Sequence, residues 1–250
     1  MKVRFLGSGD AFGSGGRLNT CFHVTSGPES GAGAFLIDCG ATALPALKAA
    51  GIDRNAIDTI LITHFHADHF GGVPFFILDA QFFAKRTAPL TIAGPEGLRD
   101  WYVRALETAF PGSSSTRQKF ELSLVELEAG RRQAVGDLTV TPQRVIHGPP
   151  GGPFFAYRIE VDGRVLAYTG DTEWTEALVE VGRDADLLIA EAYFRDKPVP
   201  FHLDLASLER NLDRIRPKRL VLTHMSDDML RQADAVPYET ARDGLEIAVA

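Results

Sequence analysis

The chain of 250 residues has 45% hydrophobic residues, which suits a protein with a sizeable buried core, and a formal net charge of -7. The acidic balance counts against non-specific nucleic-acid binding, because such binding neutralises phosphates with Lys and Arg. The longest apolar run, 73–84, is shorter than the roughly 20 residues of a membrane span, and the N-terminus lacks a signal-peptide pattern. We therefore expect a cytoplasmic protein that contacts no membrane.

Strands are predicted in the first part of the chain by short β-rich runs between Gly- and Ser-rich turns: 3–7, 21–25 and 34–40. A helix over about 42–50 ends at Gly51, and the buried strand 58–64 follows. The apolar run then predicts a buried helix over about 72–85. Two reduced thiols are expected, because a low cysteine count without an export signal is typical of a reducing compartment: Cys21 and Cys39.

The rest of the chain adds a second β-rich region. Strand 90–94 leads to a helix that begins after Pro95, continues to about Phe110 and ends at a Gly/Ser loop. Alternating apolar and polar residues predict the next strands, with an Asp-Gly hairpin turn between the last two: 120–127, 137–147, 154–163 and 164–171. Alternating strand and helix complete the pattern: strand 186–194, helix 205–215 and strand 219–224.

Two segments repeat one pattern, because 58–69 and 218–229 each contain a buried strand that ends in Thr-His and is followed by acidic residues. This repetition favours two β-rich halves built alike, each with helices on its outer face. Such halves would bring strand ends from both to one edge. No linker-like segment separates them, so we expect a single domain over residues 1–250.

A cluster of His64, His66, Asp68 and His69 places three of the seven histidines and an aspartate within six positions. His64 and His66 lie two residues apart where a strand gives way to a loop, so their side chains can point the same way. Asp68 and His69 can point to a second centre. Imidazole and carboxylate are ligands of Zn, Mn and Fe(II), and the cluster lacks the thiolates of structural zinc sites. The pattern favours an open, catalytic metal site over a solvated polar loop.

This cluster resembles the H-x-H-x-D-H motif of the metallo-β-lactamase superfamily, and Gly71 and Gly72 follow it as in that family. The resemblance implies an α+β fold, the four-layer αββα sandwich, with two metal ions at one edge of its sheets. It also implies further ligands where later strands give way to loops: His147, Asp171 and His224. Taken alone, these three have structural alternatives, namely a loop histidine, a turn or N-cap residue, and a hydrogen-bonded buried histidine.

The resemblance further implies how the ligands divide between two metal ions. One ion would be held by His64, His66 and His147, the other by Asp68, His69 and His224, with Asp171 bridging both. These ligand atoms suit zinc, and they also accept manganese or iron. A di-iron redox enzyme is disfavoured, because the related oxidoreductases generally carry a glutamate where this chain has His66.

Outside the ligands, the chain resembles the ribonuclease Z-like branch of the superfamily along most of its length. Its opening segment, 5–22, is similar to the N-terminal strand and glycine loop of that branch. This loop differs in two ways from that branch, where it ends in an Arg-Asn pair: Leu18 separates Arg17 from Asn19, and the lysine that often precedes the Arg-Asn pair is missing. They weaken the case that the loop grips RNA.

Glu191 in "EAYF" and His202 in "FHLD" resemble a further motif pair of the same branch. The resemblance implies that the carboxylate orients the imidazole, which as imidazolium protonates a leaving oxygen or steadies a phosphate. In the structural alternative, Glu191 is a polar strand-end residue and His202 a helix-capping loop residue.

Only a hairpin turn joins the strands 154–163 and 164–171, where many ribonuclease Z enzymes insert a Gly/Pro-rich arm that clamps tRNA. Without the arm, a small phosphodiester is a better candidate substrate than pre-tRNA. The cyclic phosphodiesterases of phosphonate metabolism share this motif set and handle such substrates.

The favoured hypothesis is a dinuclear metal-dependent phosphodiesterase that acts on a small or cyclic phosphodiester. A metal-bridging hydroxide would attack phosphorus, Asp68 would orient it, and His202, held by Glu191, would assist the leaving group. Three alternatives stay open: a lactone, thioester or β-lactam hydrolase, a tRNA 3′-processing endoribonuclease, and a non-enzymatic binding scaffold. The scaffold's partner would dock over Phe-rich residues that otherwise predict a core helix or a homodimer face: Phe75, Phe76, Phe82 and Phe83.

Overall fold

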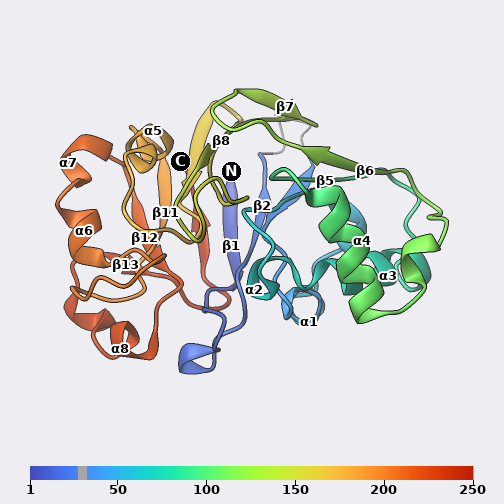
Figure 1. The fold of residues 1–250 in the computed structure, drawn as a ribbon, viewed down its shortest axis with the longest axis horizontal. Helices are drawn as coiled ribbons and strands as arrows, with labels where there is room; N and C mark the ends of the chain where they lie inside the picture. Colours follow the sequence, from blue (N-terminus) through green and yellow to red (C-terminus); the bar gives the residue numbers. More distant parts are fainter. Residues whose placement is uncertain (28–32, 250) are drawn as a thin grey trace.

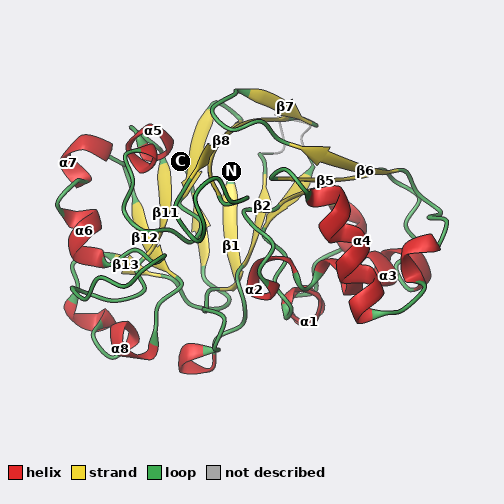
Figure 2. Ribbon diagram, in the orientation of Figure 1, coloured by secondary structure: helices red, strands yellow, loops and turns green. Residues whose placement is uncertain are grey.

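Two β-sheets face each other at the centre of the molecule, and helices cover the outer side of each (Figure 1). The computed structural model describes residues 1–27 and 33–249, and over these residues each sheet has seven strands. Helices, sheet, sheet and helices follow one another from side to side in Figure 2. This is the α+β, four-layer αββα arrangement that the sequence predicts.

The first sheet has the order β14-β1-β2-β3-β4-β5-β6, antiparallel from β14 to β3 and parallel from β3 to β6. Its strands are β1 (Lys2–Gly7), β2 (Cys21–Thr25), β3 (Ala34–Ile37), β4 (Ile57–Leu61), β5 (Leu90–Gly94), β6 (Leu122–Glu126) and β14 (Glu246–Ala248). Parallel neighbours need a crossover connection, so helices stand between them in the chain. These are α1 (Ala43–Ala49), α2 (Ala67–Phe70), α3 (Val73–Phe82) and α4 (Leu98–Ala109).

The second sheet has the order β13-β12-β11-β10-β9-β8-β7, antiparallel from β7 to β10 and parallel from β10 to β13. Its strands are β7 (Gln133–Val135), β8 (Leu138–Arg144), β9 (Phe155–Val161), β10 (Arg164–Tyr168), β11 (Leu187–Glu191), β12 (Leu220–Thr223) and β13 (Glu239–Thr240). The helices between its parallel strands are α5 (Ala177–Gly182), α6 (Leu205–Glu209), α7 (Leu212–Ile215) and α8 (Asp227–Leu230).

Apolar residues fill the space between the sheets and the space beneath the helices on each side. Side chains alternate along a strand, so in β2 Phe22 packs between the sheets while Cys21 faces the helices. Burying a large apolar side chain contributes about 1.5–3 kcal/mol, which makes these layers the main stabilising feature. Cys21 and Cys39 are buried free thiols, as expected.

Loops at one edge of the sheets hold the two halves together. The peptide N–H of Phe155 donates to the Thr63 carbonyl over 3.0 Å, and the Tyr157 hydroxyl donates to the Ile62 carbonyl over 2.6 Å. Thr63 directly precedes His64, so these bonds attach the first sheet's metal-ligand candidates to the second sheet. The two similar segments seen in the sequence contribute β4 to one sheet and β12 to the other.

The connection between β9 and β10 is a tight hairpin turn. Asp162 and Gly163 have φ angles of 54° and 67°, and left-handed conformations at both central positions are typical of a type I′ turn. The antiparallel register Val161↔Arg164 continues from it. The predicted short connection is therefore confirmed, and no arm extends from this point.

Several predicted elements differ from the structure. Strand β4 ends at Leu61, so Thr63 and His64 belong to the following loop rather than to the predicted strand 58–64. The predicted helix 205–215 is divided into α6 and α7, because Asn211 has the non-helical angles φ -120° and ψ 0°. The short elements α2, α5, α8, β7, β13 and β14 are additional. No helix in the described ranges is long and apolar enough to cross a membrane.

Helix α3 is mostly buried, as predicted, but some of its aromatic surface is exposed. Phe76 and Ile77 are buried against the first sheet. In contrast, three aromatic side chains are 43%, 54% and 78% exposed to solvent: Phe75, Phe82 and Phe83.

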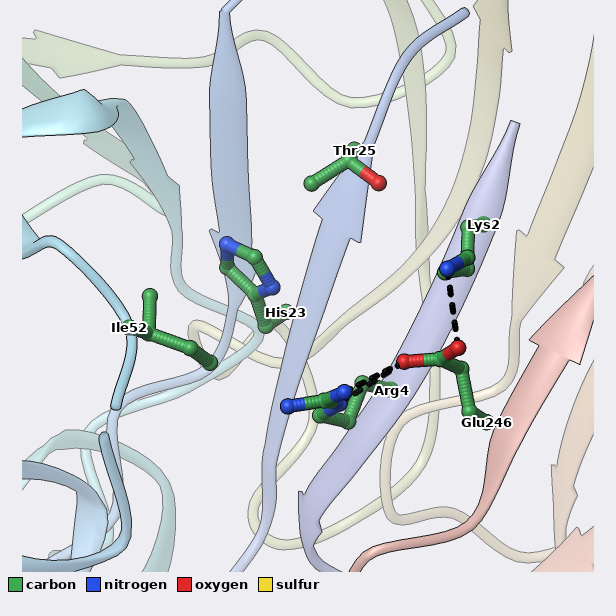
Figure 3. Close-up of a pocket in the computed structure, with 6 residues that line it drawn as sticks. All are labelled: Lys2, Arg4, His23, Thr25, Ile52 and Glu246. Carbon is green, nitrogen blue, oxygen red and sulfur yellow. Dashed lines mark hydrogen bonds and ion pairs between the residues drawn. The ribbon is translucent and has the colours of Figure 1, made fainter. Parts of the chain in front are cut away.

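Charged side chains fix β14 against β1 on the outer side of the first sheet (Figure 3). Glu246 lies 2.8 Å from the Lys2 ammonium and 2.6 Å from the Arg4 guanidinium. His23 and Ile52 line the same pocket. Glu246 pairs with both cations, so its single negative charge offsets only part of their positive charge.

Candidate metal centre

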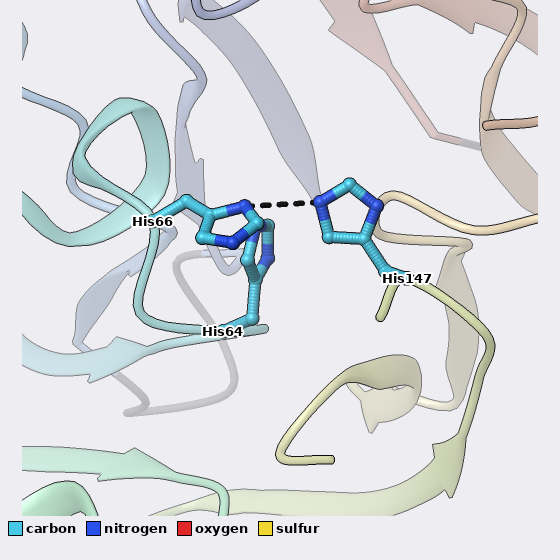
Figure 4. Close-up of side chains that lie close together, drawn as sticks. All are labelled: His64, His66 and His147. Atoms are coloured by element: carbon cyan, nitrogen blue, oxygen red, sulfur yellow. Dashed lines mark hydrogen bonds between the residues drawn. The ribbon is translucent and has the colours of Figure 1, made fainter. Parts of the chain in front are cut away.

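Three histidines from two parts of the chain form the first group of ligand candidates (Figure 4). His64 and His66 lie in the loop after β4, and His147 follows β8. The His147 Nε2 atom lies 3.0 Å from His66 Nδ1, and the ring centres of His64 and His147 are 4.8 Å apart. The structure thus brings together the residues that the sequence assigns to one metal ion.

A second group lies beside the first and combines two carboxylates with two imidazoles: Asp68, His69, Asp171 and His224. Asp171 Oδ2 lies 3.2 Å from His69 Nε2 and 3.3 Å from His224 Nε2. The same oxygen is 3.7 Å from Nε2 of His147 in the first group. Asp171 therefore occupies the position between the groups that a bridging ligand requires.

Several nitrogen and oxygen atoms in these groups are buried without a hydrogen-bond partner in the described part of the chain. His64 Nε2, His69 Nε2 and Asp171 Oδ1 are three of them. Leaving a buried polar atom unpaired is unfavourable by about 1–3 kcal/mol, more for a charged group. Divalent cations at the two groups would give these atoms partners, so the donor set fits metal ions.

Backbone and side-chain acceptors fix the orientation of the rings. Asp38 Oδ2 lies 2.7 Å from His69 Nδ1, and Asp38 Oδ1 accepts the Thr63 peptide N–H over 2.7 Å. The Phe201 carbonyl lies 2.7 Å from His147 Nδ1. A proton held on Nδ1 leaves Nε2 available as a metal ligand.

Asp38 and Phe201 were missed by sequence reasoning. Asp38 follows the buried strand β3 and has a left-handed φ of 59°, and a carboxylate at such a strand end is the signal that could have identified it. Phe201 acts through its carbonyl, which every residue type possesses, so the sequence carried no signal for it.

Burial and charge give the histidines different protonation preferences. Burial lowers the pKa of His64 well below its ordinary value, and the neighbouring charge of His69 lowers it further. Burial also lowers the pKa of His224, but Asp171, Asp68 and Glu191 outweigh this effect and raise it to about 10. Neutral imidazoles such as His64 are ready ligands, whereas His224 holds a proton that a cation would replace.

Glu191 and His202 lie together, as predicted, next to the second group. Glu191 is fully buried, and its Oε1 atom is 2.5 Å from His202 Nδ1. Its Oε2 atom accepts the peptide N–H groups of Thr172 and Leu203 over 2.9 and 3.0 Å. The Tyr193 ring stacks on His202 with centres 4.4 Å apart. One carboxylate oxygen therefore holds the imidazole of His202, and the other holds the backbone of the two loops beside it.

The glycine loop turns its two notable polar side chains inward. The Arg17 guanidinium donates to the Ala241 carbonyl over 2.6 Å, and the Asn19 amide donates to the Asp10 carbonyl over 3.2 Å. At the loop's tip, Phe12 is 84% exposed. Arg17 thus supports the fold, in line with the weakened case for an RNA grip.

A model of the family described as Anti-Pycsar protein Apyc1 matches residues 1–242. The chain belongs to this family. Ribonuclease Z of Geobacillus kaustophilus is 28% identical over 278 residues, which cover 90% of this chain and 88% of that protein. Ribonuclease Z of Methanosarcina mazei is 25% identical, with 90% and 88% covered.

This Apyc1 family member is also similar to solved structures of ribonuclease Z-type and metallo-β-lactamase-fold proteins. Human tRNase Z, short form, superposes with a TM-score of 0.79 at 26% identity and full coverage of both chains. The metallo-β-lactamase fold protein YhfI of Bacillus subtilis gives 0.76 at 20% identity, covering 99% of each chain. The predicted metallo-β-lactamase fold and ribonuclease Z-like resemblance are confirmed, and the chain is a metal-dependent hydrolase of this type.

Proposed function

We propose that this ribonuclease Z-like phosphodiesterase uses two divalent metal ions, preferably zinc, to hydrolyse a small or cyclic phosphodiester. One observation carries the proposal: the Glu191–His202 pair adjoins the metal-ligand candidates, with ligand atoms of Asp171, Glu191, His202 and His224 all within 4.8 Å of one another. A proton donor next to a metal pair suits a substrate that needs both charge neutralisation and leaving-group protonation.

The ligand assignment follows the two groups. His64, His66 and His147 would hold one ion, Asp68, His69 and His224 would hold the other, and Asp171 would serve both. The shared Asp171 oxygen and the unpartnered buried atoms support this division. Zinc suits the mixed imidazole and carboxylate set, and manganese or iron is the alternative. The Zn²⁺-bound PqqB of Methylobacterium extorquens has the same fold, with a TM-score of 0.76 at 16% identity.

Each catalytic side chain has a separate task. Bound divalent cations would lower the pKa of water and offset charge on the phosphate. Asp68 orients the attacking water. His202, held through Nδ1 by Glu191, keeps Nε2 for proton transfer. The oxygen of water bonds to phosphorus and the bond from phosphorus to the leaving oxygen breaks. His202 gives its proton to that oxygen, and the proton released by the water restores the imidazolium.

The electrostatics favour protonated His202. Burial lowers the pKa of His202, but the hydrogen bond and charge of Glu191 outweigh it and raise that pKa above its ordinary value. The imidazolium therefore persists to a higher pH than for a free histidine. This form is the one that can donate a proton.

Three features favour a small substrate over pre-tRNA. The β9–β10 connection is a two-residue type I′ turn, the Arg17 guanidinium bonds internally, and the net charge is -7. A diphosphatase of the PhnP family shares the fold with a TM-score of 0.77 at 22% identity. The ribonuclease Z relatives keep tRNA 3′-processing as the second candidate function.

The proposal includes a homodimer and a cytoplasmic location. Exposed aromatic side chains on α3 and directly after it support the dimer, because exposed apolar surface is typical of an interface: Phe75, Phe82 and Phe83. The cytoplasmic location stays a prediction from the sequence.

Metal analysis and a substrate panel test the proposal together. The panel contains bis(p-nitrophenyl) phosphate, cyclic nucleotides, pre-tRNA and an acyl lactone. We expect two equivalents of zinc per chain and turnover of the first two substrates. Turnover of the lactone alone would replace phosphodiesters by acyl substrates, efficient pre-tRNA cleavage would favour the second candidate, and metal binding without any turnover would leave the scaffold hypothesis.

A further inference from the structure

Phe201 has an unusual backbone conformation next to the proposed proton donor. Its φ of 71° lies in the left-handed region, which is unfavourable for a bulky residue. Its side chain is 42% exposed, so apolar packing is a weak restraint on this conformation. The peptide groups supply the restraint instead.

Both peptide groups of Phe201 bind side chains from another part of the chain. Its N–H donates to Glu173 Oε1 over 2.8 Å, and its carbonyl accepts from His147 Nδ1, which lies 2.7 Å away. The Glu173 peptide N–H in turn donates to the Ile146 carbonyl over 2.9 Å. The contacts therefore run from Glu173 through Phe201 to His147, and Ile146, the neighbour of His147, leads back to Glu173.

From these contacts we infer that Glu173 is a positioning residue for His147, acting through the Phe201 peptide; the inference rests on the proposed function. Glu173 holds the N–H on one side of Phe201, which restrains its left-handed φ and thereby the orientation of the carbonyl in the next peptide. The carbonyl holds the His147 proton on Nδ1 and directs Nε2 toward His66 and Asp171, at 3.0 and 3.7 Å. A carboxylate remote from the metal thereby selects the ligand form of His147.

The same turn carries the proposed proton donor. His202 directly follows Phe201, and its imidazole bonds to Glu191 over 2.5 Å. The turn is therefore fixed from two sides, by Glu173 at one residue and by Glu191 at the next. Releasing Glu173 disturbs a metal ligand and the proton donor together, whereas the Glu191 contacts keep the loop folded.

The test compares Glu173→Ala with Glu173→Gln. A glutamine oxygen can still accept the Phe201 N–H, so the conservative variant should restore what alanine removes. Glu176→Ala is the matched control, because Glu176 belongs to the same segment, is exposed and pairs with Arg214 on the surface. Circular dichroism and thermal unfolding check that all variants fold.

Zinc affinity is measured by competition with a chromophoric chelator. For Glu173→Ala we expect about 10- to 100-fold weaker binding of one zinc equivalent, with the second equivalent much less affected. Turnover of the best panel substrate should fall through kcat, with KM changed by less than about threefold, because the substrate's ground-state contacts are kept. Glu173→Gln and Glu176→Ala should resemble the parent protein.

A further readout needs neither metal nor substrate. Long-range ¹H–¹⁵N spectra of the metal-free protein should show His147 protonated at Nδ1, and Glu173→Ala should give a mixture of ring tautomers. Unchanged zinc affinity and an unchanged His147 tautomer in folded Glu173→Ala would overturn the inference. Failure of the proposed function looks different: the parent protein would bind zinc and hydrolyse no phosphodiester, while the effect on zinc affinity would persist.

Discussion

Asp38, Phe201 and His224 share a left-handed backbone conformation, with φ angles of 59°, 71° and 54°. Each contributes an atom that contacts a ligand candidate or is one itself. Non-glycine residues in this region are held there by their surroundings, and such residues concentrate at functional sites. At the residue scale, hydrogen bonds from the surrounding chain therefore fix the shape of the candidate centre.

Asp38→Asn tests how strongly the ring orientation of His69 depends on its carboxylate partner. Loss of the charge-assisted contact with Nδ1 should weaken zinc binding by about 10- to 100-fold, because partners of ligand histidines tune metal affinity. Zinc competition titrations measure the change. Asp53→Asn, at an exposed N-cap where asparagine also caps well, should leave the affinity unchanged. Equal affinities for all three proteins would contradict the assigned role of Asp38.

His202→Ala should lower phosphodiester turnover by about 10²- to 10⁴-fold, the usual contribution of a general acid, and leave zinc content intact. Because Glu191 raises the pKa of His202, parent kcat should stay high below that pKa and fall as pH rises through it. The variant should lose this limb of the pH profile. Unchanged turnover together with unchanged zinc content would refute the proton-donor assignment.

At the element scale, charged side chains pair across β14, β1 and β2 at the edge of the first sheet. Lys2 and Arg4 pair with Glu246, and Arg4 stands opposite His23 in the β1–β2 register. Burial lowers the pKa of His23, and the Arg4 charge lowers it further, to about 4 from the ordinary 6.5. The folded protein thus keeps His23 neutral where the unfolded chain protonates it.

His23 should therefore make stability depend on pH in a defined window. Between pH 6.5 and about 4, the unfolded chain binds more protons at His23, so its contribution to the free energy of unfolding falls as the pH drops. Urea unfolding at pH 7 and pH 4.5 should show a smaller loss for His23→Gln than for the parent protein. The carboxylates titrate in both proteins, so the difference isolates His23. An identical loss in both would rule out this effect.

The whole molecule brings the two halves together at the centre. His64 and Asp68 follow β4 in one half, whereas Asp171 and His224 follow β10 and β12 in the other. A cation bound by both groups would link the halves, and a ligand that binds only the folded state stabilises it in proportion to occupancy. We therefore expect metal binding to stabilise the folded chain.

Removal of metal should accordingly lower the thermal stability of the entire chain. Zinc at about 100 times its Kd should add about 2.7 kcal/mol per independent site to the free energy of unfolding. Differential scanning calorimetry with EDTA and after zinc addition measures the shift. His224→Ala should reduce the zinc-dependent shift of the unfolding temperature. An unfolding temperature that does not change with zinc would contradict the expected stabilisation.

The assembly state belongs to the same scale. Replacing Phe82 and Phe83 of the exposed α3 side by Ser should convert the proposed dimer to a monomer, because it removes apolar area without disturbing buried packing. Light scattering after size exclusion gives the mass. Phe12→Ser is the matched control, since Phe12 is exposed on a different loop. A parent protein that is already monomeric at micromolar concentration would exclude the dimer.

Local patterns were enough to predict most of the elements. β-Propensity, the positions of Gly and Pro, and the alternation of apolar and polar residues predict three of them: strand Cys21–Thr25, strand Leu90–Gly94 and the Asp162–Gly163 turn. Local patterns did not predict the division of 205–215 at Asn211 or the exposed side of α3, because both depend on neighbouring elements. Short strands such as β13 and β14 form through pairing with distant strands and carry little signal of their own.

Residue types and spacing in the segment His64–His69 were enough to predict a metal-ligand set, and with it the kind of chemistry. The sequence also supplied the distant candidates His147, Asp171 and His224 through their resemblance to family motifs. Three further facts came from the folded chain: these side chains meet, Asp171 lies between the groups, and Asp38 and Phe201 orient the rings. Orientation depends on backbone carbonyls and on contacts between residues far apart in the chain, and neither leaves a pattern in the order of amino acids.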